Sequence, residues 1–170
     1  MSSKAVEELI NSATKIISSN ISRIKNSGGD YNTFSVLGVE RDEVFTHSQM
    51  IYSFLNPKSG HYMEKKYLML FVEYVLGFTD PKDLAEEWYA EREWPFSDGR
   101  IDFVLYNDHR YIALEMKIDA IDQEAQLCRY EKYAKMQKSK YDVFYLTING
   151  KDASPQSAEG LKKDYKRISF

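Results

Sequence analysis

The sequence predicts an α/β fold in which a mixed central β-sheet is flanked by helices. Short runs rich in β-branched and aromatic residues alternate with helical patterns in the middle of the chain, in the order strand, strand, strand, helix, strand. A turn signal joins the second and third strands, which predicts an antiparallel hairpin. A helix joins the third and fourth strands, and such a crossover predicts that these two strands are parallel, with right-handed topology. A sheet with both kinds of pairing follows.

The first half of the chain is predicted to be helical. Apolar residues at helical spacing predict an amphipathic helix from Ala5 to Lys25, which Gly28-Gly29-Asp30 ends. Its apolar side consists of Leu9, Ala13, Ile16, Ile17, Ile21 and Ile24. A second helix is predicted from Asp42 to about Leu55, where Asn56-Pro57 stops it, and a third from Met63 to Gly77.

The second half of the chain contains the predicted strands. These cover residues 88–94, 100–106, 111–118 and 141–148, and a last strand begins near residue 166. A helix is predicted over residues 120–137, and the turn of the hairpin is Asn107-Asp108-His109-Arg110. Because there are no repeats and the length is that of one domain, residues 1–170 are expected to form a single domain.

Composition excludes several classes of protein. The single cysteine, Cys128, excludes an internal disulfide framework and a zinc site made of several cysteines. No apolar run reaches about 18 residues and the N-terminus has no signal-peptide core, so we expect a cytoplasmic protein that does not enter a membrane. The net charge of −3 argues against a protein that binds nucleic acid through an overall positive charge. The lysines in the last third of the chain either contact phosphates locally or form an ordinary solvated surface.

The predicted hairpin brings two carboxylates together. If the loop 107–110 is symmetric, Asp102 on one strand lies directly opposite Glu115 on the other, with Cβ atoms about 5 Å apart. Both residues stand in otherwise apolar runs, and two like charges buried together need a counter-charge. Lys117 lies on the same face and supplies one positive charge, and a divalent metal would supply the rest. The alternative is a salt-bridged trio on an exposed face of the sheet.

Such a group of residues suits phosphodiester hydrolysis. Oxygen ligands with open coordination positions favour Mg²⁺ or Mn²⁺ over a closed zinc site. A metal held by Asp102 and Glu115 would polarise the phosphoryl group and help to activate water. Lys117 would orient that water or offset the developing negative charge.

These residues resemble a known family. Gly99-Arg100-Ile101-Asp102, followed by Glu115-Met116-Lys117 on the next strand, resembles the PD-(D/E)XK nuclease superfamily. Further segments resemble one branch of it, a group of bacterial and viral nuclease-like proteins; these segments are residues 43–48 with Asn56-Pro57 and His61, residues 122–130, and residues 145–150. The resemblance covers most of the chain from Phe34 to Gly150, and it implies a restriction-endonuclease-like core.

The resemblance also implies roles for individual residues. It implies Asp102 and Glu115 as metal ligands, the Met116 carbonyl as a further ligand, Lys117 as the catalytic lysine and Glu43 as an acidic group that reaches the same site. No proline precedes Asp102, a departure that the family tolerates. The chain stops at Phe170, where such proteins usually continue, so we expect a truncated or short form.

Other polar residues are candidates for contacts with nucleic acid, namely His47, Ser48, Gln123, Gln126, Arg129 and Tyr130. His47 lies one helical turn after Glu43 and either binds the metal with it or orients it. Gln123, Gln126 and Tyr130 share one face of the predicted helix, where they either position water and contact the backbone of the nucleic acid or form ordinary helix surface. Glu91 and Glu93, on the strand before the hairpin, rank below Glu43 as further acidic groups of the site.

The sequence therefore predicts a Mg²⁺-dependent deoxyribonuclease, with Mn²⁺ as the alternative metal and DNA as the substrate. One alternative is a hydrolase of RNA or of a small phosphodiester. The other is an inactive relative that binds nucleic acid or a protein partner through the same fold, although the presence of all three core residues argues against it. The sequence leaves a homodimer open.

Overall fold

The computed structural model describes residues 3–28 and 32–169, and the chain forms two compact units, residues 1–40 and 41–170. The first unit contains α1 (Ser3–Ser27) and the short α2 (Thr33–Val36). The predicted first helix is confirmed, and Gly28 follows it with a left-handed φ of 66°. The other two residues of the predicted stop, Gly29 and Asp30, lie outside the described residues. α2 was not predicted; the Asn32 side chain caps it by accepting a hydrogen bond from the Phe34 N–H.

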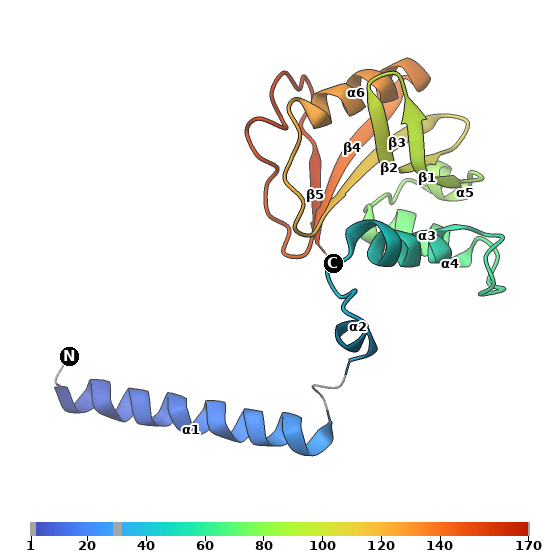
Figure 1. Cartoon of the computed structure of the whole chain (residues 1–170). Coiled ribbons are helices and arrows are strands. Elements are labelled where there is room, and N and C mark those ends of the chain that lie inside the picture. The colour runs from blue at the N-terminus through green and yellow to red at the C-terminus, as the bar shows by residue number, and fades with distance from the viewer. Residues whose placement is uncertain (1–2, 29–31, 170) are drawn as a thin grey trace. The chain divides into compact units, whose positions relative to one another are not determined.

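The second unit is built on a five-stranded mixed sheet with the strand order β1-β2-β3-β4-β5 (Figure 1). The strands are β1 (Tyr89–Phe96), β2 (Gly99–Tyr106), β3 (Arg110–Lys117), β4 (Lys140–Thr147) and β5 (Lys166–Ser169). Adjacent strands from β1 to β3 are antiparallel, whereas β3–β4 and β4–β5 are parallel. The chain passes from β3 to β4 through α6 (Gln126–Gln137). The predicted α/β class and the parallel pairing across this crossover are confirmed.

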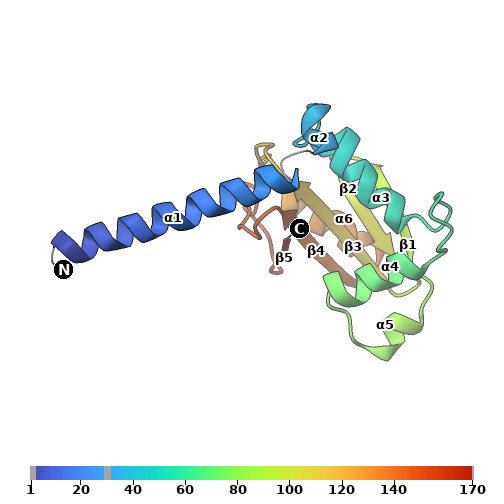
Figure 2. The same cartoon turned by 90° about the horizontal axis from the view of Figure 1, so that it is seen from below.

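Helices cover both faces of the sheet, so that β3 is buried on both sides. One core lies between the sheet and the helices α3 (Gln49–Leu55), α4 (Lys66–Leu70), η2 (Phe71–Val75, π-helical) and α5 (Pro81–Ala85), and η1 (Glu43–Ser48, π-helical) leads into α3. It includes Leu55, Leu68, Val72, Trp88, Leu114 and Phe144. The other core lies beneath α6 and includes Val104, Ala113, Leu127, Ala134 and Val143. In Figures 1 and 2, α6 lies on one side of the sheet and α3 and α4 on the other. Side chains of β3 alternate between the two cores, which is how polar groups reach a defined place on the α6 side.

Several helix ends differ from the prediction for local reasons. The predicted third helix begins at Lys66 rather than Met63, because Tyr62 and Glu64 have left-handed φ angles of 56° and 49°. The helix predicted over residues 120–137 begins only at Gln126, because Ala125 is left-handed with a φ of 48°. The unpredicted α5 is started by Asp80, whose side chain accepts a hydrogen bond from the Lys82 N–H.

Within residues 3–28 and 32–169, no helix combines the length and the apolar content that crossing a membrane requires.

Candidate metal and catalytic site

The β2–β3 hairpin has the register that places Asp102 opposite Glu115. Its turn is symmetric: the Asn107 N–H donates to the Arg110 carbonyl at 3.0 Å, and the Asn107 side chain accepts from the N–H groups of His109 and Arg110. Regular pairing runs from Tyr106–Tyr111 to Phe103–Leu114, and Asp102 and Glu115 are the next pair in this register. There the Asp102 side chain takes the place of a backbone acceptor, since its Oδ2 accepts the Met116 N–H at 2.9 Å.

Glu115 is fully buried and held from three sides. Lys117 Nζ lies 2.6 Å from its Oε1, and the Gln126 side-chain amide donates to the same oxygen at 2.7 Å. The Tyr130 hydroxyl, which accepts from Gln126, lies 2.6 Å from Oε2 of Glu115. Gln126 and Tyr130 are one turn apart on α6, and α6 packs directly on β3 and β4. The carboxylate is therefore locked in one orientation.

The two carboxyl groups perturb each other. Burial and the neighbouring charge of Glu115 raise the pKa of Asp102 well above its usual 3.8, and the Met116 N–H and Lys117 only partly oppose this. Burial also raises the pKa of Glu115, against the opposing effects of Lys117, Tyr130 and a hydrogen bond with Asp102. Two carboxyl groups that share a site repel each other when both are ionised, so one of them keeps its proton to a higher pH. A cation at that position would reduce this repulsion.

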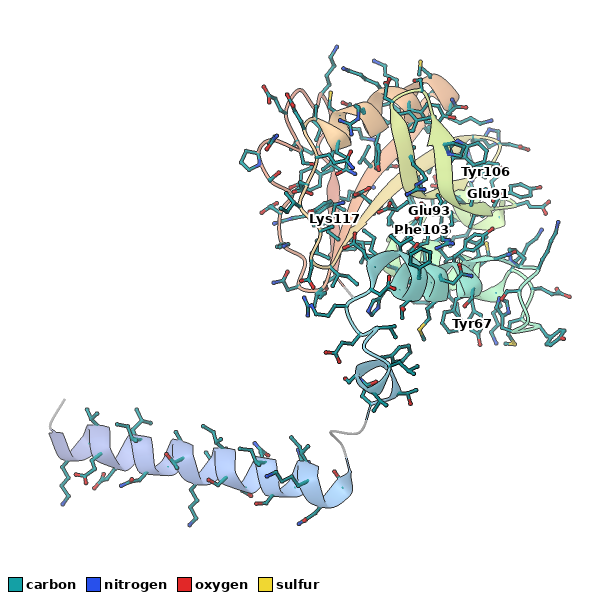
Figure 3. The ribbon with its side chains drawn as sticks, viewed as in Figure 1. Tyr67, Glu91, Glu93, Phe103, Tyr106 and Lys117 are labelled. Carbon is teal, nitrogen blue, oxygen red and sulfur yellow. The ribbon has the colours of Figure 1, made fainter. Side chains whose placement is uncertain are left out.

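Lys117 keeps its charge in this environment. Burial lowers its pKa, but the charge and hydrogen bond of Glu115, with the charges of Asp102 and Glu43, outweigh burial and raise the pKa of Lys117 above 10.5. Lys117 and Glu115 are 6% and 0% exposed. The alternative of an exposed salt-bridged trio is therefore wrong. Figure 3 shows the labelled Lys117 at the end of β3 that lies away from the β2–β3 turn.

Glu43 reaches this end of β3 from η1. Its Oε2 accepts the Ile118 N–H at 2.7 Å and the Ala120 N–H at 3.4 Å, so it fixes the chain where β3 ends. The Asp42 side chain places Glu43 by capping η1 through the Phe45 N–H. Next to it, Arg41 pairs with Asp119, which joins the same two segments a second time at the surface. The structure thus brings the predicted fourth residue to the site, and its role as a metal ligand stays a prediction.

A third carboxylate lies in the same row. Glu93 stands on β1 between Arg92 and Trp94, which pair with Phe103 and Ile101, so Glu93 is level with Asp102. Its backbone has a left-handed φ of 55°, and its charge contributes to the raised pKa of Asp102. It also pairs with Arg100. Glu91 instead lies near the Tyr52 hydroxyl, at 3.4 Å (both glutamates of β1 are labelled in Figure 3).

The remaining candidates divide into two groups. Gln126 and Tyr130 are buried at 4% and 1% exposure and contact Glu115. Gln123 is exposed, precedes α6, and accepts a hydrogen bond from Arg129, so it does not share a helix face with Gln126 and Tyr130 as predicted. His47 is half-buried, and Ser48 is buried on η1.

The donor set at the site suits a hard divalent cation. Two carboxylates and the Met116 carbonyl are oxygen donors, which Mg²⁺ and Mn²⁺ prefer. Residues 3–28 and 32–169 contain no group of three or more His, Cys, Asp or Glu side chains arranged to hold a metal ion. The pair Asp102 and Glu115 fits a cation that completes its coordination with backbone carbonyl, water and substrate oxygens, as Mg²⁺ commonly does.

Comparison with known proteins identifies the family. A family model described as the PD-(D/E)XK nuclease superfamily matches residues 31–170, which includes every element of the sheet and the hairpin with Asp102, Glu115 and Lys117. No curated protein and no solved structure matches the chain. The five-stranded mixed sheet flanked by helices agrees with the restriction-endonuclease-like core that this family implies, and the match supports a function of the nuclease type. The chain belongs to the PD-(D/E)XK nuclease superfamily.

Proposed function

We propose that this protein is a nuclease that hydrolyses DNA phosphodiester bonds with the help of Mg²⁺ or Mn²⁺ held by Asp102 and Glu115. The observation that carries the proposal is the pair of carboxyl groups itself, in which the pKa of Asp102 is raised by burial and by Glu115. A pair that costs stability in the absence of a cation and that a cation would stabilise is typical of a functional site. Membership of the nuclease superfamily supports a nucleic-acid substrate.

The residues of the chain divide the chemical work. Asp102 and Glu115 would supply anionic oxygens to the cation, and the Met116 carbonyl would supply a neutral one. Lys117 stays protonated beside Glu115, so its ammonium group can orient the attacking water and offset the negative charge that develops on the phosphoryl oxygens. When bound, the divalent cation polarises the phosphodiester and lowers the pKa of water.

Gln126 and Tyr130 are positioning residues in this proposal. The Gln126 amide donates to Glu115, and the Tyr130 hydroxyl lies 2.6 Å from Glu115 and 2.7 Å from the Arg100 carbonyl, with one hydrogen to donate to either; these contacts fix the direction of the remaining lone pairs of Glu115. Burial and the charges of Glu115 and Asp102 raise the pKa of Tyr130, so its hydroxyl remains a neutral donor. Contacts with the nucleic acid are proposed for His47, Gln123 and Arg129, which are at least partly exposed, whereas Ser48 is buried and does not reach the surface.

The experiment is a cleavage assay with matched substrates and metals. Linear DNA, circular DNA and RNA of equal length are incubated with the protein in Mg²⁺, Mn²⁺ or EDTA. We expect cleavage of DNA that EDTA abolishes and that Lys117→Met reduces by at least about 100-fold. Lys82→Ala, which removes an exposed lysine of α5, is the matched control and keeps full activity.

Two outcomes would contradict the proposal. Cleavage that survives EDTA, or that Lys117→Met leaves unchanged, removes the metal and the lysine from the mechanism. Binding of DNA in EDTA without cleavage under any condition favours the inactive binding module, and cleavage confined to RNA moves the substrate to the alternative class.

A further inference from the structure

The N-terminal helix α1 carries a continuous apolar face that no described residue of the N-terminal unit covers. We call this face the apolar stripe, and it consists of Val6, Leu9, Ile10, Ala13, Ile16, Ile17, Ile21 and Ile24. Leu9 and Ile16 are 64% and 63% exposed, and all described side chains of α1 are exposed. Helices in proteins gain most of their stability from burying such a face, and α1 lacks this contribution while the stripe is exposed.

We propose that α1 is a self-association helix, and that its apolar stripe packs against α1 of a second copy of this chain in antiparallel orientation. Spacing, area and charge each support this. The proposal concerns the N-terminal unit and does not depend on the nuclease activity.

The spacing of the stripe is that of a helix pair. Ile10, Ile17 and Ile24 recur every seven residues, and Val6 and Ala13 each lie four residues before one of them. Apolar residues separated alternately by three and four positions form the seam of a two-helix coiled coil. Asn20 continues the series of Val6 and Ala13, and a single polar residue in such a seam fixes the register at some cost in stability.

The area of the stripe is sufficient for a specific dimer. Its seven large side chains are 37% to 64% exposed. At roughly 180 Å² for a fully exposed residue, one copy offers on the order of 600 Å² of apolar surface, and two copies bury about 1,200 Å², the lower end of stable interfaces. A patch of this size equals the largest found on ordinary monomers and usually marks an interaction site.

The charges of α1 select the antiparallel orientation. The acidic residues of α1, Glu7 and Glu8, lie near its N-terminus together with Lys4, and the chain from Leu9 to Ser27 contains Lys15, Arg23 and Lys25 but no Asp or Glu. Glu7 and Lys25 are eighteen residues apart, which is five helical turns, so they share one edge of the stripe. Antiparallel packing brings Glu7 of each copy to Lys25 of the other at both ends of the pair. Parallel packing would instead place Glu7 at the level of Glu7, and Lys25 at the level of Lys25, of the other copy.

The test measures the mass of the full chain in solution by light scattering and sedimentation over a range of concentrations. We expect a dimer of twice 19.9 kDa that dissociates on dilution. The double variant Ile10→Glu, Ile17→Glu is expected to weaken association at least about 100-fold. The matched control Asn11→Glu, Ser22→Glu adds the same charge on the opposite face of α1 and leaves the dimer intact, because neither residue belongs to the stripe.

A charge exchange tests the orientation without disturbing the stripe. Glu7→Lys is expected to weaken the dimer roughly three- to thirty-fold, and Glu7→Lys combined with Lys25→Glu restores it. A parallel pair would be insensitive to both changes and would overturn the orientation. A monomer at all concentrations, or a dimer that survives Ile10→Glu, Ile17→Glu, would overturn the proposal, as would a monomer that uses the stripe to bind anionic lipid vesicles.

Discussion

Replacing Asp102 by asparagine separates the stability of the candidate site from its function. The asparagine side chain keeps the size of the aspartate, and its oxygen can still accept the Met116 N–H. Its amide group would donate to Glu115, where Asp102 now presents a second carboxyl group. The substitution therefore removes one of two competing negative charges and adds a favourable hydrogen bond.

The sign of the expected effect follows from the raised pKa of Asp102. A carboxyl group whose pKa is higher in the folded state than in the unfolded state costs stability as the pH rises above the ordinary value of about 3.9, and that cost is complete above its folded pKa. At neutral pH and without metal, Asp102→Asn is expected to raise the free energy of unfolding by about 1–3 kcal/mol, the usual contribution of a hydrogen bond donated to a charged group. For a chain of this size, such a gain raises Tm by about 2–10 °C.

Without metal, Asp102→Asn is expected to be more stable than the wild-type protein, and a bound metal ion should make the wild-type protein the more stable of the two. A cation at one hundred times its Kd stabilises the wild-type protein by about 2.7 kcal/mol, or about 5–10 °C in Tm. Asp102→Asn is expected to lose that response together with DNA cleavage. Thermal unfolding with EDTA and with Mn²⁺ measures both effects, and Asp164→Asn, which changes an exposed carboxylate, is the control that keeps the wild-type behaviour.

Two results would refute the reasoning. A large loss of stability of metal-free Asp102→Asn would mean that the carboxylate is a structural acceptor without strain from Glu115. An unchanged Tm response to Mn²⁺ in this variant would mean that the cation binds elsewhere.

Three further substitutions test other parts of the second unit. Tyr130→Phe removes a donor from Glu115; we expect a loss of about 1 kcal/mol in thermal unfolding and of roughly tenfold in cleavage rate, and an unchanged rate would remove Tyr130 from the positioning network. Burial raises the pKa of Asp142, but Lys163 and Lys166 outweigh it and lower that pKa, so its stabilisation is present above about pH 4 and is lost as the pH falls through the folded pKa. Asp142→Asn is therefore expected to lower the free energy of unfolding by about 3 kcal/mol at pH 7, measured by urea unfolding, and to reduce the loss of stability at low pH. If the loss of stability at low pH is unchanged in this variant, other carboxylates cause it. Within the described residues the buried Thr147 hydroxyl has no hydrogen-bond partner, so Thr147→Val should raise the free energy of unfolding by about 1 kcal/mol, and a loss would mean that this hydroxyl is satisfied.

The hairpin of the site could be predicted because its register depends on local sequence. Asn107 closes a symmetric turn with its side chain, and a two-residue alternation then fixes which side chains share a face. The position of Asp102 relative to Glu115 followed from these two facts. The parallel pairing of β3 and β4 followed from the crossover helix in the same way.

The start of α6 could not be predicted because tertiary contacts determine it. The Asp122 carboxylate accepts the Tyr145 hydroxyl at 2.8 Å and the Ser154 N–H at 2.7 Å, and these partners lie far away in the sequence. They hold residues 118–125 in an irregular conformation that ends at the left-handed Ala125, although the local sequence favours a helix.

The roles of Gln126 and Tyr130 were misjudged for a related reason. Their spacing placed them on one helix face, but whether that face contacts solvent or the sheet depends on how α6 packs. The structure turns it toward Glu115, so they support the carboxylate rather than face the nucleic acid. The signal that was present is the lack of charge at both positions, which suits a buried face.

The most direct test of the metal site is a crystal structure of the protein grown with Mn²⁺, with the metal located by its anomalous scattering. We predict one strong peak in contact with the carboxylates of both Asp102 and Glu115, which disappears in crystals of Asp102→Asn. A structure with Mn²⁺ present in which no peak touches either carboxylate, while Lys117 and Asp102 keep their contacts with Glu115, would contradict the proposed metal site.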